Sequence, residues 1–398
     1  MRLLSIKIGK AWQTLKREGF VHGMKRIIPA GLALFGRVRP ADVLFVTGGV
    51  GDSARFRTKH VAEEIGFRGI TSSVTVQDNP RLSSYAGKFS VFVFHRVLFT
   101  PSVAKLIALI KKQGKEIIFE TDDLVHDPAF LKHMDYWRLM NSMERKLYEN
   151  GVGGEILADP YVKVATTSTS FIADELRTKG KRVFVIPNRL PESDVKTVAP
   201  LYEERMARLA SGARDTVTIG YFSGSLGHDK DFGTITGAML HLLEKYPRLR
   251  LLLVGPLTID DRFEVFSGRI ERMHYVPRQR HFENISQSDI IIAPLEIGNP
   301  FCEGKSELKF FEAGILGVPT VACVTRTFRE AITDGVDGFV AADEAQWEEK
   351  LERLITDPDL RKRIGEQARK TALSKYVTTD ADDREYVEYL KEAIARVR

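Results

Sequence analysis

Residues 299–323 read NPFCEGKSELKFFEAGILGVPTVAC, and this stretch decides the fold of the 398-residue chain. A short run rich in β-branched residues, Ile290–Pro294, precedes it, and a second run, Thr320–Cys323, closes it. Between the two runs, Lys305–Leu316 has the apolar spacing of an amphipathic helix. A strand, a helix and a strand in this order form a βαβ unit, whose two strands are parallel. The stretch therefore predicts an α/β protein with a parallel sheet.

The same alternation of strands and helices extends on both sides of this unit and predicts two sets of strands. The first set is Asp42–Thr47, Ile70–Val76, Ser90–Phe94, Glu116–Glu120, Val162–Thr166 and Val183–Ile186, and the second set is Thr216–Phe222, Leu249–Val254, Ile270–Tyr275, Ile290–Pro294, Thr320–Cys323 and Gly338–Ala341. A chain of this length is also expected to form two domains with separate cores.

Between the two sets, the pattern gives way to a polar segment with several prolines, and we interpret residues 191–215 as a linker with a short helix. The N-terminal domain then covers residues 41–190, and the C-terminal domain covers residues 216–378. A helix within residues 379–398 follows and could cross back to the N-terminal domain. The prediction is two tandem Rossmann-like domains, each a doubly wound parallel sheet, that face a cleft. Ligands of such sheets bind beyond the carboxyl ends of the strands, so the loops after the strands are the first places to look for function.

The positive charge of the chain is concentrated in an N-terminal arm, residues 1–40. The whole chain has 59 basic and 53 acidic residues, a net charge of +6. Nine of the basic residues and one of the acidic residues lie in the arm, so the remaining 358 residues are slightly negative in total. A nucleic-acid binder needs a positive surface for phosphates, which the body of the chain does not supply. We therefore expect no nucleic-acid partner.

Residues 1–28 of the arm interleave cations with apolar side chains. This pattern is typical of a helix that lies on an anionic membrane surface. A solvated leader that docks on the body of the protein fits the same residues, and the sequence leaves both alternatives open. The apolar run Ile27–Phe35 is too short to span a hydrocarbon core of ~30 Å. The two cysteines, Cys302 and Cys323, give no disulfide framework. We expect a cytoplasmic protein, at most peripheral at the inner face of the membrane.

The loop after the first strand is rich in glycine. Gly48, Gly49 and Gly51 are followed by Asp52 and Arg55. Glycines at a strand exit let backbone amides approach a ligand, and Arg55 could reach a phosphate. A tight turn without a ligand is the alternative, and for this loop alone it is the favoured interpretation.

Carboxylates gather at the exit of the strand Glu116–Glu120. Glu120 is followed by Asp122 and Asp123. Clustered carboxylates can bind a divalent cation or orient hydroxyl groups, whereas the alternative is capping of the next helix. Their place beside the expected cleft favours a functional role.

The first loop of the second domain contains small residues and then basic ones. Gly224 and Ser225 precede His228 and Lys230. Such a loop can form a cradle for phosphate groups where it leads into a helix. A lysine on a solvated first turn is the alternative, and the sequence does not decide between them.

The stretch Asn299–Gly314 contains the densest group of candidate residues. Read as a loop that enters a helix near Lys305, it presents backbone amides and the positive end of a helix dipole to a diphosphate. Lys305 adds a positive charge there, and Glu312 could accept two hydroxyl groups, as a ribose requires. A merely solvated helix face is the alternative, and it must explain five charged residues at one junction.

These segments together resemble glycosyltransferases of the GT-B fold, in particular the large retaining family 4. The resemblance rests on residues 312–322 (EAGILGVPTVA), on Leu252–Gly255 and on Gly335–Phe339. Within that family it is closer to bacterial cell-surface polysaccharide transferases, whose pattern is similar to Asn299-Pro300-Phe301 followed by Lys305–Lys309.

The resemblance implies roles for single residues. Glu312 would bind the ribose of a nucleoside-diphosphate sugar, and Lys230 and Lys305 would neutralise the diphosphate. Glu303 would face the transferred sugar, although eight residues separate it from Glu312 where the family pattern has seven. The remaining donor-binding candidates are Gly224, Ser225, His228 and Ser306.

We therefore expect a hexosyltransferase-type enzyme that moves a sugar from a nucleoside-diphosphate sugar to a hydroxyl of a glycan or lipid-linked glycan. The resemblance implies bacterial surface polysaccharide synthesis and retention of configuration. Lysines and helix amides would hold the leaving diphosphate, so we expect no metal and no cofactor. Asp122 or Asp123 would orient the acceptor, and the catalytic candidates are Asp122, Asp123, Glu303 and Lys305.

Two other classes of function stay open. A GT-B-like protein without catalysis could bind a nucleotide or a glycan as a scaffold. An epimerase acting on nucleotide sugars, or a phosphorylase, could use the same fold. Consumption of a nucleotide sugar that depends on an acceptor distinguishes a transferase from all three.

Overall fold

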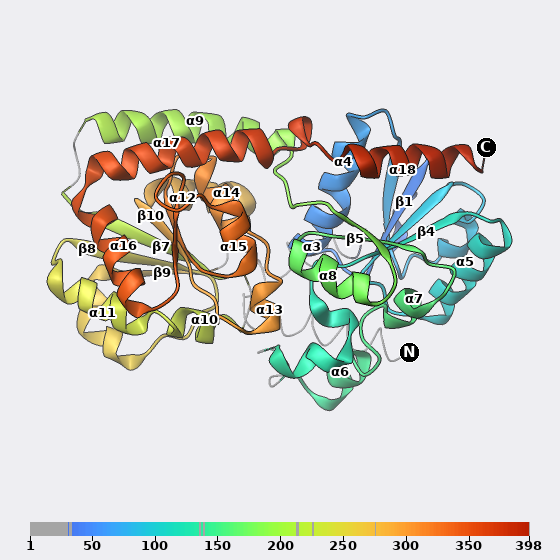
Figure 1. Ribbon diagram of the computed structural model, residues 1–398, viewed down its shortest axis with the longest axis horizontal. Coiled ribbons are helices and arrows are strands. Elements are labelled where there is room, and N and C mark those ends of the chain that lie inside the picture. Colours follow the sequence, from blue (N-terminus) through green and yellow to red (C-terminus); the bar gives the residue numbers. More distant parts are fainter. Residues whose placement is uncertain are drawn as a thin grey trace. The chain divides into compact units, whose positions relative to one another are not determined.

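The computed structural model describes residues 31, 34–134, 137, 140–211, 215–224, 227–274 and 276–397. Within these ranges the chain forms two compact units (Figure 1). Unit 1 contains the described residues of Met1–Lys132, Trp137–Ile186 and Asp382–Arg398, and unit 2 contains those of His133–Tyr136 and Pro187–Ala381. The basic segment 1–28 lies outside the described residues. No helix in the described part of the chain has both the length and the apolar character that crossing a bilayer requires.

A six-stranded parallel sheet forms the centre of unit 1. Its strands are β1 (Val43–Thr47), β2 (Ser72–Val76), β3 (Val91–His95), β4 (Glu116–Glu120), β5 (Val164–Thr167) and β6 (Arg182–Val185). They lie in the order β2-β1-β3-β4-β5-β6, and all six predicted strands of this set are confirmed. β1 and β3 are buried along their whole length. This is expected for continuous apolar strands in a parallel sheet that is covered on both faces. The winding direction reverses between β1 and β3, which makes the carboxyl ends of these two strands a topological switch point.

Helices cover the sheet of unit 1. They are α3 (Asp52–Ala54), the π-helical η1 (Arg55–His60), α4 (Val61–Gly66), the 3-10 helices η2 (Leu82–Tyr85), η3 (Leu124–His126) and η4 (Pro128–His133), and α5 (Pro101–Lys112), α6 (Ser142–Leu147), α7 (Gly154–Ala158), α8 (Ser170–Thr178) and α18 (Arg384–Ala395).

The C-terminal helix α18 belongs to unit 1 although the residues before it belong to unit 2 (Figure 1). Its apolar face carries Tyr386, Leu390 and Ile394, which share one buried cluster with residues of β1, β3 and α4. Burial of these side chains stabilises the end of the chain on the N-terminal sheet. The return begins at Asp382, a few residues after the predicted boundary at 379.

Unit 2 has a second six-stranded parallel sheet. Its strands are β7 (Val217–Phe222), β8 (Leu249–Val254), β9 (Ile270–Met273), β10 (Ile290–Ala293), β11 (Thr320–Cys323) and β12 (Phe339–Ala341). The order is β12-β11-β10-β7-β8-β9, again with parallel pairing throughout, so the second predicted set is also confirmed. This order is that of the Rossmann fold, and its switch point lies between β7 and β10.

The helices of unit 2 lie on both faces of this sheet. They are α9 (Glu192–Ala210), α10 (Asp229–Gly233), α11 (Thr236–Lys245), the 3-10 helix η6 (Asp261–Arg269), α12 (Arg278–Gln287), α13 (Pro300–Glu303), α14 (Leu308–Gly314), α15 (Arg326–Ala331), α16 (Glu344–Thr356), α17 (Pro358–Lys375) and the 3-10 helix η7 (Thr378–Asp380).

The segment predicted as a linker, residues 191–215, instead contains the regular helix α9, which is part of unit 2. Arg205 of α9 is buried, and its guanidinium donates hydrogen bonds to the carbonyl oxygens of Ser286 and Ser288, at 2.9 and 2.5 Å. α9 also lies beside α17, where the guanidinium of Arg369 stands over the Tyr202 ring (Figure 1). The prediction underestimated this helix because its sequence is mostly polar and only Val198 and Arg205 are buried in it.

Candidate functional site

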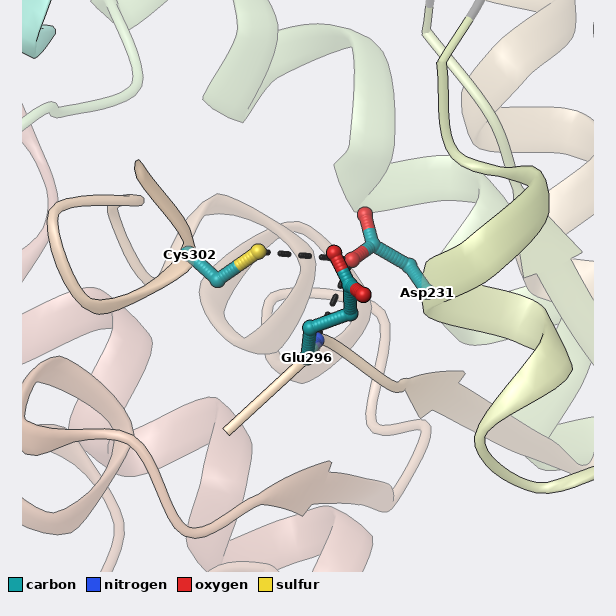
Figure 2. Close-up of side chains that lie close together, drawn as sticks. All are labelled: Asp231, Glu296 and Cys302. Carbon is teal, nitrogen blue, oxygen red and sulfur yellow. Dashed lines mark hydrogen bonds between the residues drawn. The ribbon is translucent and has the colours of Figure 1, made fainter. Parts of the chain in front are cut away.

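The loops after β7 and β10 meet at the switch point of unit 2, and both contain predicted site residues. The loop after β7 leads through His228 into α10, and the loop after β10 leads through Asn299 into α13. A carboxylate at the start of α10 joins the two loops (Figure 2). Asp231 faces His228 Nδ1 at 2.8 Å, accepts the backbone N–H of Glu296 at 3.2 Å and accepts the thiol of Cys302 at 3.4 Å.

The side chains of Asp231, Glu296 and Cys302 lie close enough to be tested as a metal site, since their ligand atoms are within 4.8 Å of one another. Burial raises the pKa of the Cys302 thiol, so the sulfur keeps its proton and acts as a hydrogen-bond donor. Glu296 already accepts a hydrogen bond from the Asn299 amide at 3.0 Å. In this structure the three residues are joined by hydrogen bonds through Asp231, which connects the loop after β7 to the loop after β10.

Three basic side chains lie together at this switch point. Burial lowers the pKa of His228, and the charges of Lys309 and Lys305 lower it further. Burial likewise lowers the pKa of Lys309, and Lys305 adds to that effect. Basic groups gathered in this way can attract an anion. Lys309 was not among the predicted site residues.

Glu312 lies in α14 and is almost fully buried, with 4% of its surface exposed. Its Oε1 pairs with the Arg278 guanidinium, and its Oε2 lies 3.0 Å from His281 Nε2. Burial alone raises the pKa of this carboxyl, but Arg278 and His281 outweigh burial and lower it far below its usual value. Glu312 is therefore ionised, as an acceptor of two hydroxyl groups must be, and it is held by two residues that the sequence did not single out.

The helix that was predicted to begin near Lys305 is divided in two. α13 ends at Glu303 and α14 begins at Leu308, so Lys305 lies in the turn between them. Pro300 favours the first turn of a separate short helix, which Asn299 caps by accepting the Phe301 amide at 3.0 Å. Lys305 therefore does not lie in the first turn of the longer helix. It contributes its own positive charge to the site, without the dipole of that helix.

Glu303, predicted as a catalytic residue, and Ser306, predicted as a donor-binding residue, form internal hydrogen bonds. The carboxylate of Glu303 accepts the backbone N–H of Arg326 at 2.9 Å and that of Gly298 at 3.4 Å. It thereby caps the N-terminus of α15, which is a structural role. Ser306 Oγ accepts a hydrogen bond from the Asn188 amide at 2.9 Å.

The remaining predicted residues of unit 2 lie in or near the loop after β7. Gly224 is exposed and has open space around it, and Lys230 is exposed in α10. Ser225 lies outside the described residues.

The switch point of unit 1 places the glycine-rich loop against the end of β3. A Cβ on Gly48 would lie 1.9 Å from the Arg96 carbonyl oxygen, so only glycine fits there. Gly49 and Gly51 have no such neighbour, and the exposed Asp52 forms an ion pair with the partly buried Arg55 at 3.1 Å. The geometry of this loop is thus explained by a tight turn.

A polar cluster that the sequence only partly predicted lies at the same edge of unit 1. His95, the last residue of β3, has Thr47 Oγ1 at 3.0 Å from Nδ1 and Ser53 Oγ at 3.0 Å from Nε2. The same Nε2 lies 3.5 Å from Asp122 Oδ1. Thr47 donates its hydroxyl hydrogen to the Gly49 carbonyl oxygen at 3.1 Å. The Thr47 oxygen therefore accepts a hydrogen bond from the Nδ1–H of His95.

Arg96 binds both of the predicted aspartates. Its Nε lies 2.6 Å from Asp122 Oδ1, and its Nη2 lies 3.0 Å from Asp123 Oδ2. Burial alone raises the pKa of Asp122, but Arg96 and His95 outweigh burial and lower it well below its usual value. Arg96 has a φ of 47°, in the left-handed region that non-glycine residues seldom occupy. Strain of this kind is characteristic of functional sites.

The third carboxylate of the predicted cluster has a structural role. Glu120 accepts hydrogen bonds from Arg57 Nε at 2.8 Å and from Arg57 Nη2 at 3.2 Å, and it also accepts the Thr166 hydroxyl. All three side chains are buried. The hydrogen bonds of Glu120 connect η1 to β4 and β4 to β5.

Comparison with known proteins gives a family match for unit 2. Residues 236–381 match the family model described as "Glycosyl transferase-like". The chain is also 26% identical over 180 residues to a Bacillus subtilis (strain 168) protein named "Putative glycosyltransferase EpsD". This alignment covers 45% of the present chain and 46% of the relative, so the chain spans about half the length of the curated relative that it matches.

Solved structures share the fold of both units at low sequence identity. Anabaena Alr3699/HepE in complex with UDP is 13% identical with a TM-score of 0.57, covering 88% of this chain and 100% of that chain. Sucrose-phosphate synthase from Thermosynechococcus elongatus is 13% identical with a TM-score of 0.58, covering 89% and 98%. The catalytic domain of Arabidopsis thaliana Starch Synthase IV, bound to ADP and acarbose, is 12% identical with a TM-score of 0.56, covering 90% and 99%. The chain therefore has the predicted GT-B fold.

Proposed function

We propose that the chain is a glycosyltransferase that moves a sugar from a nucleoside-diphosphate sugar, bound by unit 2, to a hydroxyl of a glycan or lipid-linked glycan. The observation that carries the proposal is the group of basic side chains His228, Lys305 and Lys309 near the ionised Glu312. The positive charge of the basic group matches a diphosphate, and the carboxylate of Glu312 matches the two hydroxyl groups of a ribose. The glycosyl transferase-like match of residues 236–381 covers Lys305, Lys309 and Glu312 and supports the assignment.

In this proposal the basic group stabilises the departing diphosphate as the bond to the sugar breaks. Charge that develops on a leaving group is held best by groups already in place before the reaction. We propose that Lys305 and Lys309 perform this task without a metal ion or a cofactor. Turnover that survives removal of divalent cations with EDTA supports this point, and turnover that EDTA abolishes contradicts it.

We assign the acceptor to unit 1, where Asp122 and Asp123 lie at the ends of the central strands. The pKa of Asp122 lies too low for it to take a proton at neutral pH, so its role is to accept a hydrogen bond from the acceptor hydroxyl. Arg96 and His95 hold Asp122 in position for that task.

The finer parts of the proposal are transfer of a hexose, retention of configuration and a place in bacterial surface polysaccharide synthesis. They rest on the resemblance of the sequence to family 4 transferases. Proton NMR of the first product formed reports the anomeric configuration directly, and a product of inverted configuration contradicts retention.

We further propose that the enzyme works in the cytoplasm and that residues 1–28 bring it to the anionic inner face of the membrane. Deletion of residues 1–28 is expected to abolish sedimentation with vesicles that contain an anionic lipid. Unchanged sedimentation excludes this role for the arm.

The direct test of activity is consumption of a nucleotide sugar in the presence and absence of acceptor. The HepE complexes contain UDP and UDP-glucose, so UDP-glucose is the first donor to test. A transferase releases the nucleoside diphosphate faster when a glycan acceptor is present. Interconversion of the donor without an acceptor indicates an epimerase instead.

A further inference from the structure

His228 lies where the two loops of the unit 2 switch point meet, and its neighbours act on its charge in opposite directions. Asp231, from the adjoining helix α10, faces Nδ1 at 2.8 Å and favours the charged imidazolium. Lys305, from the turn after α13, and Lys309, from α14, disfavour the imidazolium, as burial does. Only 15% of the His228 side chain is exposed. The pKa of His228 is lowered in consequence, so the ring is mainly neutral at pH 7.

The carboxylate that faces His228 is itself fixed from its other side (Figure 2). Asp231 Oδ1 accepts the Glu296 amide at 3.2 Å and the Cys302 thiol at 3.4 Å, while Oδ2 points to His228. Glu296 and Cys302 both belong to the loop after β10 and the short helix that follows it. The orientation of His228 therefore depends on both loops of the switch point.

We propose that Asp231 is a positioning residue that holds His228 so that the imidazole takes up one proton from solvent when a diphosphate binds beside Lys305 and Lys309. This inference rests on the donor site proposed above. A bound diphosphate adds negative charge next to the two lysines and offsets the repulsion that they exert on an imidazolium. The carboxylate of Asp231 fixes the Nδ1–H, so the added proton goes to Nε2 and turns that nitrogen from an acceptor into a donor.

Proton uptake gives donor affinity a pH dependence of definite sign. The complex favours the charged ring, so the pKa of His228 is higher in the complex than in the free protein. Affinity then rises as the pH falls between these two values, by at most about tenfold per pH unit for one linked proton. Below the pKa of the free protein the affinity becomes constant.

The experiment begins with thermal-shift screening of UDP-, ADP-, GDP- and dTDP-glucose, and it continues with the donor that binds. These sugars lack a phosphate monoester, whose second pKa of about 6 would confuse the measurement. Titration calorimetry is performed between about pH 5.5 and 8.5, the range in which a histidine titrates. At each pH, buffers of different ionisation enthalpy are compared, because the buffer dependence of the binding enthalpy counts the protons taken up.

Three variants separate the positioning role from general damage to the fold. His228→Gln keeps a polar side chain and is expected to remove both proton uptake and the pH dependence. Asp231→Asn is expected to move the proton uptake to lower pH, because the charge that favours the imidazolium is gone. His241→Gln is the matched control, since His241 also pairs with a carboxylate, Glu348, at 2.9 Å but is more than half exposed. It is expected to behave as the unmodified chain does.

The outcomes distinguish this inference from the donor site itself. Binding without proton uptake overturns the inference and leaves the donor site intact. Proton uptake that persists in His228→Gln also overturns it, because another group then takes the proton. If Asp231→Asn does not fold, His228→Gln alone decides. Failure of every nucleotide sugar to bind overturns both the donor site and the inference.

Discussion

Replacement of Glu312 by glutamine tests whether the buried carboxylate of unit 2 binds a ribose. A carboxylate has about four lone-pair positions. Arg278 and His281 each use one oxygen of Glu312, which leaves one position on each oxygen for a hydroxyl. Glutamine keeps one oxygen acceptor and turns the other position into a donor. Because a hydrogen bond to a charged group contributes about 1.5–3 kcal/mol, loss of one such bond weakens donor binding by roughly tenfold to 150-fold.

The same substitution also removes a charge that Arg278 faces. Loss of one partner of a buried ion pair costs about 3–5 kcal/mol when the other is left alone. Arg278 keeps Asp194 at 2.7 Å and is 20% exposed, so we expect a smaller loss, about 1–3 kcal/mol. For a unit of this size, each kcal/mol lowers the melting temperature by about 2–4 °C.

The assay therefore measures stability and affinity separately. Thermal unfolding without ligand gives the change in melting temperature, and calorimetry at a temperature where both proteins are folded gives the dissociation constant. Glu283→Gln is the matched control, since Glu283 is only partly buried and pairs with the exposed Arg280 on α12. A variant Glu312→Gln that melts earlier but binds every donor as tightly as the unmodified chain refutes the ribose role.

Three further predictions concern other parts of the molecule. Burial raises the pKa of Glu307 from 4.5 to about 7, so the folded form keeps a proton that the unfolded form releases, and stability falls as the pH rises from 4.5 to 7. Glu307→Gln should therefore raise the free energy of unfolding by up to about 3 kcal/mol above pH 7 and by little near pH 4. Urea unfolding at both pH values measures this difference, and no gain in stability above pH 7 contradicts the raised pKa of Glu307. Asp122→Asn should lower acceptor-dependent turnover by about 10²-fold while donor affinity stays constant, and a loss of donor binding contradicts the acceptor role. Gly255 has a φ of 95°, and a Cβ there would lie 1.9 Å from the Ser223 carbonyl oxygen. Gly255→Ala should therefore lower the free energy of unfolding by at least about 2 kcal/mol in thermal unfolding. Gly268 has open space around it, so Gly268→Ala should not lower stability in this way.

The strands could be predicted from the sequence because the sheets are covered on both faces. A strand such as β4, which reads EIIFE, is buried nearly throughout and stands out as a short apolar run. In residues 191–215 only a short helix was predicted, and the full length of α9 and its place in unit 2 could not be recognised in the same way. Besides Val198, the residue that anchors it is Arg205, whose hydrogen bonds to Ser286 and Ser288 depend on a helix that lies about eighty residues away in the sequence.

The candidate site was predictable only where its residues are neighbours in the sequence. Lys305 and Glu312 belong to one local motif, and Glu312 lies in a helix as predicted, whereas Lys305 lies in the turn before that helix. Arg278 and His281 reach Glu312 from α12, and no local pattern marks a contact between two helices. Lys309 could have been found, since it lies four residues after Lys305.

Glu303 is a case in which a sequence pattern was a poor guide. It fits the family pattern with a shift of one position, yet its carboxylate accepts hydrogen bonds from the backbone amides of Gly298 and Arg326. Sequence spacing could not reveal these partners, because they depend on how α13 packs against the start of α15. His95 and Arg96 were missed as well, although the position of His95 at the carboxyl end of β3 is the signal that could have found them.

The central claim, that unit 2 binds a nucleoside-diphosphate sugar at the switch point between β7 and β10, is tested most directly by a crystal structure of the chain with such a sugar bound. We predict that the diphosphate lies within hydrogen-bonding distance, about 3 Å, of Lys305, Lys309 and His228, and that the ribose hydroxyls lie on Glu312. A diphosphate bound elsewhere, or a ribose without contact to Glu312, contradicts the claim.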